Sequence, residues 1–488
     1  MSNITNNLTS GFVDLATYDE MEKYMYGGAS AFTYFVKQMR KATWFTVVPC
    51  VLNRIGGSTF GSQYSVTISR AGDYMIRSWM RVQLPAIDLS AYKDSIYPLF
   101  GSQNPNASGT VWGPNDVSIR YTRNFMHNLI KECSLTFNDL VESRFDNWFL
   151  DFWAAFTVPA GKRNGYQNMI GNFEELTNPI VIGQLPMILP SVVLNLPLPF
   201  THFRESGLSL PTAALPYNEM RINVATRNLN ELLIIDNHKL GTSIPCPPNI
   251  LTQASVSQQL TADIWAEYAL VSNMERAQMG KAPRDMLIEQ VQTAPIQQFQ
   301  SNFGTNTTVN LHFAHAIKAL YFAVQNVTNP SEWSNYTCGS PVPSALGVTF
   351  SPTMSTDPIA TTSLYYENTQ RLANIGSDYF SLIQPWYTAI DIPLETGYHL
   401  YSYSLDLVNF HPLGSTNYGK LTNVSLACSP SADATIAGNA PGSGSTVNNP
   451  SVFGAQGAPV NQIYNIVVVG QNHNIIRIAG GALGFPVL

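Results

Sequence analysis

The sequence predicts an all-β protein made of two similar units in tandem, on three observations. Segments such as 65–69 and 79–84 alternate apolar and polar residues with a period of two, which is typical of half-buried strands. Turn clusters rich in Gly, Pro, Asn and Ser separate such segments, for example at 54–58. Finally, CSLTFND (133–139) resembles TSLYYEN (362–368), and each motif is followed by an arginine and an aromatic run. Two copies of one sandwich or jelly roll follow from this pattern.

The composition favours a protein that makes large contacts with other protein. Charged residues form 12% of the 488 residues, about half of the usual ~25%, and Asn, Ser, Thr and Gln supply much of the polarity. Uncharged polar groups cost less to desolvate than ions. A neutral secreted or β-rich protein is the alternative interpretation. The net charge of −6 and the lack of a long basic run argue against nucleic acid as a partner.

The cysteines and the apolar stretches bear on the compartment. The five cysteines, Cys50, Cys133, Cys246, Cys338 and Cys428, have no metal or redox spacing, so we expect free thiols in a reducing environment. The first residues lack the basic and apolar regions of a secretory signal. Apolar stretches are broken by Pro and Gly well short of the ~20 residues that a membrane-spanning helix needs. We therefore expect no membrane span.

The N-terminal arm, residues 1–28, is predicted to contain one short helix. Thr17 and Glu20 have the spacing of a capping box, so a helix should follow through Met25 and end at Gly27 and Gly28. The segment 18–26 is acidic, which suits it poorly to an anionic bilayer. We expect this helix to contact protein.

A second helix is predicted in the first unit, residues 29–236. After Asn138, apolar and aromatic residues recur at helical spacing, with Asn138 as N-cap and an end before Pro159. The favoured interpretation is a helix that lies on the sheet of its own unit. The proline-rich region 175–218 should form loops and edges, and residues 241–249 are the best linker candidate.

The second unit, residues 237–488, is predicted to resume strands. They are expected at 264–271, 285–291 and 316–327. At the end of the chain, 464–469 and 474–478 flank GQNH as a probable hairpin that would place His473 in its turn. A long low-complexity loop is expected at 434–450.

No catalytic residue, cofactor or metal site is predicted. His312 and His315 would face opposite sides of a strand, and no third ligand completes a set. The glycine-rich stretches 56–61 and 442–445 lack the context of a nucleophile elbow or phosphate loop and are expected to be turns. Glu174 and Glu175 could suggest an acid–base pair for sugar hydrolysis, but solvated charges are the favoured interpretation.

The chain also contains candidate glycosylation sites. Seven N-x-S/T sequons occur, at Asn3, Asn7, Asn106, Asn306, Asn326, Asn335 and Asn423. Asn-rich composition generates such sequons by chance, and Asn326 falls in a predicted strand. We expect all seven to be unmodified.

Ten blocks of sequence follow one another in a recognisable order from residue 10 to the end. The blocks are SGFVDLATYDEMEKYMYGG (10–28), SRAGDY (69–74), RNFMHNLI (123–130), NMIGN (168–172), LPYNEMRI (215–222), HAIKAL (315–320), SDYFSL (377–382), GSTNYGKLTN (414–423), NHNIIRI (472–478) and GGALGFPVL (480–488). Together they resemble the major capsid proteins of iridoviruses, within the double jelly-roll capsid family of nucleocytoplasmic large DNA viruses, and are most similar to forms from invertebrate hosts. Loops near 88–118, 238–260, 340–356 and 429–460 are individual to this chain.

The resemblance implies a structural protein of the virion and no enzyme. Its fold would be two tandem eight-stranded jelly rolls, and three chains would form a homotrimeric, pseudo-hexameric capsomer. Neighbouring capsomers would tile an icosahedral shell over an internal lipid membrane that the chain does not span. Minor capsid proteins beneath the shell are further expected partners, with the helix at 18–26 as their candidate contact, and assembly would take place in host cytoplasm. The alternative is a carbohydrate-binding or carbohydrate-active jelly-roll protein.

The last nine residues, GGALGFPVL, carry no charge. Apolar surface left in water costs roughly 25 cal/mol per Å², so we expect this tail to be buried against its own domain or a neighbouring chain. Leu483, Phe485, Val487 and Leu488 would be its anchors.

Overall fold

The computed structural model describes residues 2–37, 39–57, 59–100, 117–178, 187–237, 242–257, 259–281, 283–302, 304–339, 356–438 and 462–486. The chain divides into two compact units, an N-terminal arm (Met1–Trp44), which extends beyond the predicted arm of residues 1–28, and a body (Phe45–Leu488).

The arm contains two helices, α1 (Ser2–Ala16) and α2 (Glu20–Met25). The predicted end of α2 at Met25 is confirmed, and Gly27 and Gly28 follow it with positive φ. The predicted capping box is wrong in register. Asp19 is the N-cap, and its backbone N–H donates to the Glu22 carboxylate at 3.2 Å. Thr17 instead donates its hydroxyl to the carbonyl of Asp14 at 2.6 Å.

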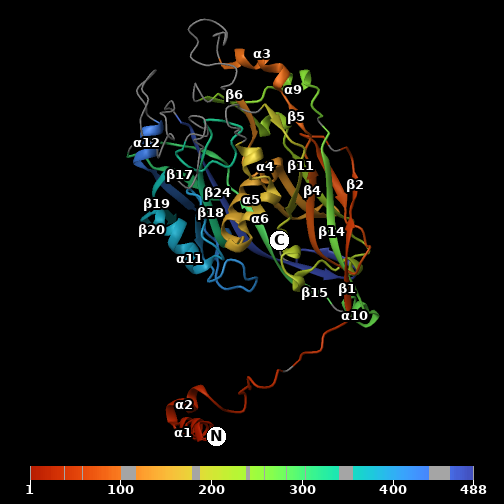
Figure 1. Cartoon of the computed structure of the whole chain (residues 1–488), viewed down its shortest axis with the longest axis vertical. Coiled ribbons are helices and arrows are strands. Elements are labelled where there is room, and N and C mark those ends of the chain that lie inside the picture. The colour runs from red at the N-terminus through yellow and green to blue at the C-terminus, as the bar shows by residue number, and fades with distance from the viewer. Residues whose placement is uncertain are drawn as a thin grey trace. The chain divides into compact units, whose positions relative to one another are not determined.

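The first half of the body is an eight-stranded jelly roll (Figure 1). One sheet has the order β1-β14-β4-β10, and the other β3-β11-β7-β8 with β2 added at its edge. The strands of the first sheet are β1 (Phe45–Val51), β14 (Thr261–Val271), β4 (Tyr74–Gln83) and β10 (Val193–Pro197). Those of the second are β2 (Asn53–Ile55), β3 (Gln63–Thr67), β11 (Met220–Thr226), β7 (Ile130–Phe137) and β8 (Leu140–Phe145).

The second half repeats this arrangement strand for strand. Its sheets have the orders β15-β24-β18-β21 and β17-β23-β19-β20, so the two jelly rolls that the sequence predicts are confirmed. The first sheet is formed by β15 (Arg284–Thr293), β24 (Tyr464–Ala479), β18 (Ala316–Asn326) and β21 (His399–Ser402). The second is formed by β17 (Thr307–Asn310), β23 (Val424–Pro430), β19 (Ile359–Tyr366) and β20 (Thr369–Gly376).

Shorter elements connect these strands. Minor strands are β5 (Ile87–Asp88), β6 (Val117–Tyr121), β9 (Ile188–Leu189), β12 (Leu233–Asn237), β13 (Thr242–Pro245), β16 (Gln297–Phe299), β22 (Thr416–Asn417) and β25 (Ala482–Gly484). The helices of the body are α3 (Lys93–Ile96), α4 (Phe125–Leu129), α5 (Asn147–Thr157), α6 (Ala160–Ile170), α7 (Glu174–Thr177), α8 (Leu229–Leu232), α9 (Pro248–Gln253), α10 (Asn273–Met279), a π-helical turn η7 (Tyr379–Ile383), α11 (Gln384–Thr388) and α12 (Ala432–Gly438).

One strand lies in a different jelly roll from the one predicted. The sequence predicts residues 264–271 as part of the second unit, but β14 pairs with both β1 and β4 of the first. The last strand of this jelly roll returns between two earlier strands, after an excursion through β12, β13 and α9. Residues 242–249 of the predicted linker (241–249) are therefore part of that excursion, and residue 241 lies outside the described residues.

The sheet of β18 and β24 is buried on both faces. On β18, Phe322 belongs to the core of the second jelly roll, whereas Tyr321 belongs to a larger cluster that is continuous with the core of the first. An uninterrupted apolar run is the sequence signature of a strand covered on both sides. The two jelly rolls are consequently joined by apolar packing as well as by the chain.

The predicted hairpin around GQNH is wrong. Residues 464–479 form one continuous strand that pairs with β18 on one side and with β15 and β16 on the other. Two of its polar side chains are buried and have partners: Gln471 donates to Glu289 at 2.6 Å, and Asn472 accepts from Gln292 at 2.8 Å. His473 lies within this strand, paired with Glu289 of β15 and Ala316 of β18.

The C-terminal tail packs on its own chain. Gly480 and Gly481 turn the chain with positive φ, and β25 then pairs back onto β24. The backbone N–H of Leu483 donates to the side chain of Asn218 at 3.0 Å, and Leu483 is buried. Phe485 packs at the edge of the same core cluster. The expected burial is thus confirmed for these two anchors, whereas Val487 and Leu488 lie outside the described residues.

Candidate functional site: the interface between the jelly rolls and the exposed α11 face

Helix α5 begins later than the sequence predicts. Asn138 adopts a left-handed conformation (φ 54°) in the turn between β7 and β8. The N-cap is Asp146, whose side chain accepts from the backbone N–H of Phe149 at 2.9 Å. The predicted end before Pro159 is confirmed. The residues between the β7–β8 turn and Asp146 form β8, which pairs with β7 as the edge strand of the second sheet.

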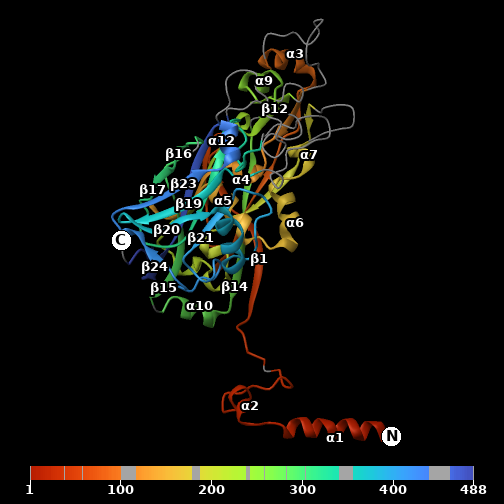
Figure 2. The same cartoon turned by 90° about the vertical axis from the view of Figure 1, so that its left-hand side faces the viewer.

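The aromatic face of α5 packs against the other jelly roll. Phe149, Phe152 and Phe156 are each 0% exposed, and all three rings contact Tyr321 of β18, with centroids 5.8–6.2 Å apart. The expectation that this helix lies on its own sheet is therefore wrong. Figure 1 shows α4 and α5 between the strands of the first half and those of the second, and in the turned view of Figure 2 α6 lies at the edge of the body. We call this contact region the inter-domain interface.

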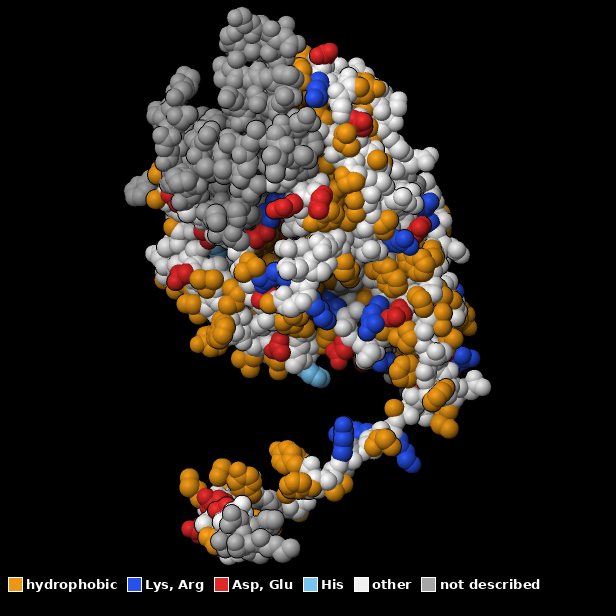
Figure 3. Space-filling view, viewed as in Figure 1, with side chains coloured by type: hydrophobic (Ala, Val, Ile, Leu, Met, Phe, Trp, Pro, Cys, Tyr) orange, Lys and Arg blue, Asp and Glu red, His pale blue; other side chains and the backbone are white. Residues whose placement is uncertain are grey.

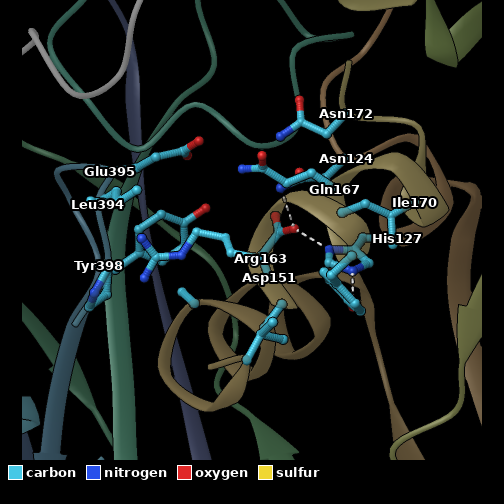
Figure 4. Close-up of a pocket in the computed structure, with 15 residues that line it drawn as sticks. Asn124, His127, Asp151, Arg163, Gln167, Ile170, Asn172, Leu394, Glu395 and Tyr398 are labelled. Carbon is cyan, nitrogen blue, oxygen red and sulfur yellow. Dashed lines mark hydrogen bonds and ion pairs between the residues drawn. The ribbon is translucent and has the colours of Figure 1, made fainter. Parts of the chain in front are cut away.

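A buried carboxylate, Asp151 of α5, organises the polar part of the inter-domain interface (Figure 4). It accepts hydrogen bonds from Asn124 at 3.0 Å and from His127 Nδ1 at 2.7 Å. From the second half, Ser334 and Tyr336 donate their hydroxyls to it at 2.7 and 2.8 Å. Such bonds can offset the desolvation of a buried charge only when they are well placed. Asp151 therefore ties the two halves together in one geometry.

The same cluster has no free base or nucleophile. With His127 Nδ1–H donating to Asp151, its Nε2 accepts from the hydroxyl of Tyr166 at 2.7 Å. Burial raises the pKa of Tyr166, so this phenol stays protonated as a donor. Both ring nitrogens of His127 are thus occupied. The small cavity in Figure 4, lined also by Glu395 and Tyr398, therefore borders a hydrogen-bonded network that has a structural role.

Buried ion pairs reinforce the interface. Arg120 of β6 contacts Asp236 and Glu332, each at 2.6 Å, and all three side chains are nearly inaccessible to water. Burial disfavours the charged guanidinium, but the two carboxylates raise the pKa of Arg120 overall.

A second group surrounds Glu289 of β15. This carboxylate contacts Lys318 at 2.5 Å and Arg204, from the first half, at 2.5 Å. Burial lowers the pKa of Lys318 despite the attraction of Glu289. Removing one member of such a group leaves a buried charge without its partner, which costs several kcal/mol of unfolding free energy.

The helix that corresponds to α5 in the second jelly roll is exposed. α11 follows β19 and β20 as α5 follows β7 and β8. On it, Trp386 and Tyr387 are 71% and 77% exposed. Figure 3 shows hydrophobic side chains gathered over this region. We call this surface the α11 face; it comprises Leu382, Ile383, Trp386, Tyr387 and Ile390, all exposed.

The residues considered for metal or acid–base chemistry do not form a site. His312 is exposed and His315 adopts a positive φ of 63° outside any strand. Among the described residues, no group of three His, Cys, Asp or Glu side chains could hold a metal ion. Glu174 and Glu175 are exposed in the first turn of α7. Residues 56–61 include turn glycines with positive φ at both ends, and 442–445 lie outside the described residues.

The sequons differ in accessibility. Asn326 and Asn335 are buried and hydrogen-bonded, Asn326 to Gln462 at 2.9 Å and Asn335 to Gly339 at 3.1 Å. Asn7, Asn306 and Asn423 are exposed. The side chain of Asn3 and all of Asn106 lie outside the described residues.

All five cysteines are free, as predicted. No helix in the described part of the chain is both long and apolar enough to cross a membrane.

The fold and the interface define a class: a double jelly-roll protein whose two barrels are fixed in one block. Comparisons agree. Residues 33–271 match the family model described as "Major capsid protein N-terminus", and residues 275–484 match "Large eukaryotic DNA virus major capsid protein". The solved structure titled "PBCV-1 virus capsid, quasi-atomic model" has a TM-score of 0.67 at 19% identity and covers 93% of this chain and 100% of its own. The Faustovirus major capsid protein has a TM-score of 0.64 at 12% identity, over 92% and 93%.

Relatives of higher identity specify the family. The chain is 51% identical to the major capsid protein of Costelytra zealandica iridescent virus, over 100% of both chains, and 43% identical to that of Frog virus 3 (isolate Goorha), again over 100% of both. This chain belongs to the major capsid protein family of large eukaryotic DNA viruses, among the iridovirus members. It is a structural component of the virion that builds the capsid shell, and not an enzyme.

Proposed function

We propose that three copies of this chain associate head to tail into a capsomer of six similar lobes. The observation that carries the proposal is the contrast between two corresponding helices. The aromatic face of α5 is buried inside the chain, whereas that of α11 is exposed to solvent. Apolar patches of this kind on a soluble protein commonly mark an interaction surface.

The contact inside the chain indicates how the chains would meet. α5 covers the outer face of the sheet β15-β24-β18-β21, through Tyr321 of β18. The equivalent sheet of the first jelly roll is β1-β14-β4-β10. If the same contact recurs between chains, the α11 face of one copy covers that sheet in the next. A head-to-tail contact of this sort closes into a ring when the rotation permits.

The outer face of β1-β14-β4-β10 has suitable side chains. Trp79 of β4 and Trp265 of β14 stack with ring centroids 6.0 Å apart and are only partly covered. They alternate with Met80 and Ile264, which fill the core, so both indoles lie on the outer face. On the neighbouring edge strand β1, Val47 is exposed. Aromatic side chains on both partners are what stable protein interfaces favour.

Six similar lobes about a threefold axis form a near-hexagonal block. Such capsomers would tile the outer icosahedral shell over an internal lipid membrane, with assembly in host cytoplasm. The free thiols are consistent with that reducing compartment. The acidic helix α2, on which Glu20 is exposed and Glu22 is partly exposed, is the proposed contact for minor capsid proteins.

Light scattering on the purified protein tests the trimer. We expect a native mass near three times the chain mass. The double variant Trp386→Ser, Tyr387→Ser should be monomeric and folded, because both side chains are exposed within the chain. Met274→Ser on α10 is the matched control, since it removes an equally exposed apolar side chain away from the α11 face. A monomeric wild type, or a double variant that remains trimeric, would refute the proposal.

A further inference from the structure

The N-terminal arm has a polarised charge distribution. Residues 1–22 contain four carboxylates and no Lys or Arg, whereas residues 23–44 contain four Lys or Arg and no carboxylate. The lack of Asp and Glu continues to Asp73, in a chain whose net charge is −6. Lys37, Arg40 and Lys41 fall within five residues and are exposed. This segment therefore presents a local positive charge that the rest of the chain does not.

Aromatic side chains alternate with these cations and are left in water. Phe35 is 97% exposed, Trp44 87% and Tyr34 86%, and Phe32 and Met39 are similarly bare. In Figure 3 the Lys and Arg side chains of the arm lie among hydrophobic ones. Tryptophan and tyrosine beside basic residues are typical of segments that lie at a membrane–water boundary, where rings enter the headgroup region and cations contact lipid phosphates.

Helix α1 offers a second apolar surface in the same arm. Leu8, Phe12 and Leu15 are exposed and, at separations of four and three residues, share one face of the helix. Asp14 is its single charged residue, and the other polar positions are Ser, Thr and Asn. An amphipathic helix whose polar face carries a single charge can lie shallowly at a lipid surface.

We infer that residues 32–44 bind an anionic lipid surface, with α1 as an additional shallow anchor. The inference rests on the proposed shell over a membrane and assigns the segment that would contact it. A protein partner would need a groove that is acidic and also has room for several aromatic rings. An anionic bilayer offers negative charge and an apolar layer at any point of its surface. The acidic helix α2 stays available for protein, as proposed above.

Vesicle flotation with the full-length protein tests this inference. We expect binding to phosphatidylcholine vesicles that contain phosphatidylserine, weak binding to pure phosphatidylcholine, and release by added salt. The variant K37E/R40E/K41E should bind the anionic vesicles about a hundredfold more weakly, since each basic residue near such a surface contributes roughly fivefold. The control K162E/K281E/K420E changes the net charge equally at exposed sites of the body and should bind like the wild type.

Two further readouts separate the possible outcomes. Phe35→Ser with Trp44→Ser should weaken binding at high salt, where the rings rather than the charges hold the arm. Wild-type protein that fails to float, or K37E/R40E/K41E that floats like its control, would overturn the inference and leave the arm to a protein partner. Light scattering on the same samples keeps the proposed function separate: trimers that do not float contradict only the lipid contact, and monomers that float contradict only the trimer.

Discussion

Helices α5 and α11 occupy the same place in the two jelly rolls, yet one is buried and the other is exposed. The rings of α5 fill the inter-domain interface against Tyr321, whereas Trp386 and Tyr387 of α11 contact water. The same supersecondary unit is thus used once to fix two barrels within a chain and once, as we propose, to join chains. Stability of the subunit and assembly of the capsomer should therefore respond to different substitutions.

The largest expected effect comes from the buried charges of the inter-domain interface. Arg120→Met leaves Asp236 and Glu332 buried without their cation, so we expect a loss of about 3–5 kcal/mol in the free energy of unfolding. Arg77→Met, which breaks an exposed pair with Glu267, should cost about 0–1 kcal/mol. Urea unfolding measures both. Equal losses in the two variants would contradict the assigned role of the buried cluster.

Truncation of corresponding aromatic residues separates the two helices directly. Phe152→Ala should destabilise the subunit by about 3–5 kcal/mol because it opens a cavity at the inter-domain interface. Trp386→Ala should change the stability of the isolated subunit by no more than about 0.5 kcal/mol and weaken trimer formation. Thermal unfolding and native mass, recorded for both variants, give the comparison. Trp386→Ala that destabilises the monomer as much as Phe152→Ala would show that α11 is not a bare surface.

The C-terminal tail is expected to have an intermediate effect on subunit stability. Leu483 is buried against the first half, next to Asn218. Leu483→Ala should cost about 2–3 kcal/mol of unfolding free energy, and removal of residues 480–488 should yield aggregate or monomer. Leu405→Ala, at an exposed leucine of the same body, is the control and should be close to neutral. A normal trimer from the truncated chain would contradict the account of the tail.

The smallest expected effect is a dependence of the subunit's free energy of unfolding on pH. His202 and Glu142 are both buried, with His202 Nε2 3.5 Å from Glu142 Oε1. Burial disfavours the charged imidazole, but Glu142 raises its pKa above 6.5 overall. The interaction of protonated His202 with Glu142 therefore stabilises the folded chain fully below about pH 6.5. This stabilisation is lost as the pH rises through the folded-state pKa of His202. Unfolding measured against pH should therefore show a decline that His202→Gln flattens. A slope that persists unchanged in His202→Gln would assign it to other groups.

Sequence patterns predicted the elements with strong local signals and failed where tertiary contacts decide. Two tandem jelly rolls follow from strand periodicity and from the echo between 133–139 and 362–368, which the structure places on β7 and β19. The N-cap of α5 was misplaced because the apolar spacing runs through β8 into the helix. The GQNH segment looks like a turn, and only the buried partner of Gln471 shows why it continues as a strand.

The exposure of the α11 face could not be predicted from the sequence either. The sequence predicts an aromatic run after each of the two similar motifs, but the residue types do not reveal which of the two runs is covered. The polar network around Asp151 was missed for a similar reason, since its donors come from positions as far apart as Asn124 and Tyr336.

Photo-crosslinking from the α11 face tests the central claim most directly. With a benzophenone amino acid in place of Tyr387, irradiation of the assembled protein should yield covalent dimers, and mass spectrometry should place the link in peptides of β4 or β14 from a second chain. Links that stay within one chain, or that reach a second chain only at other surfaces, would contradict the account.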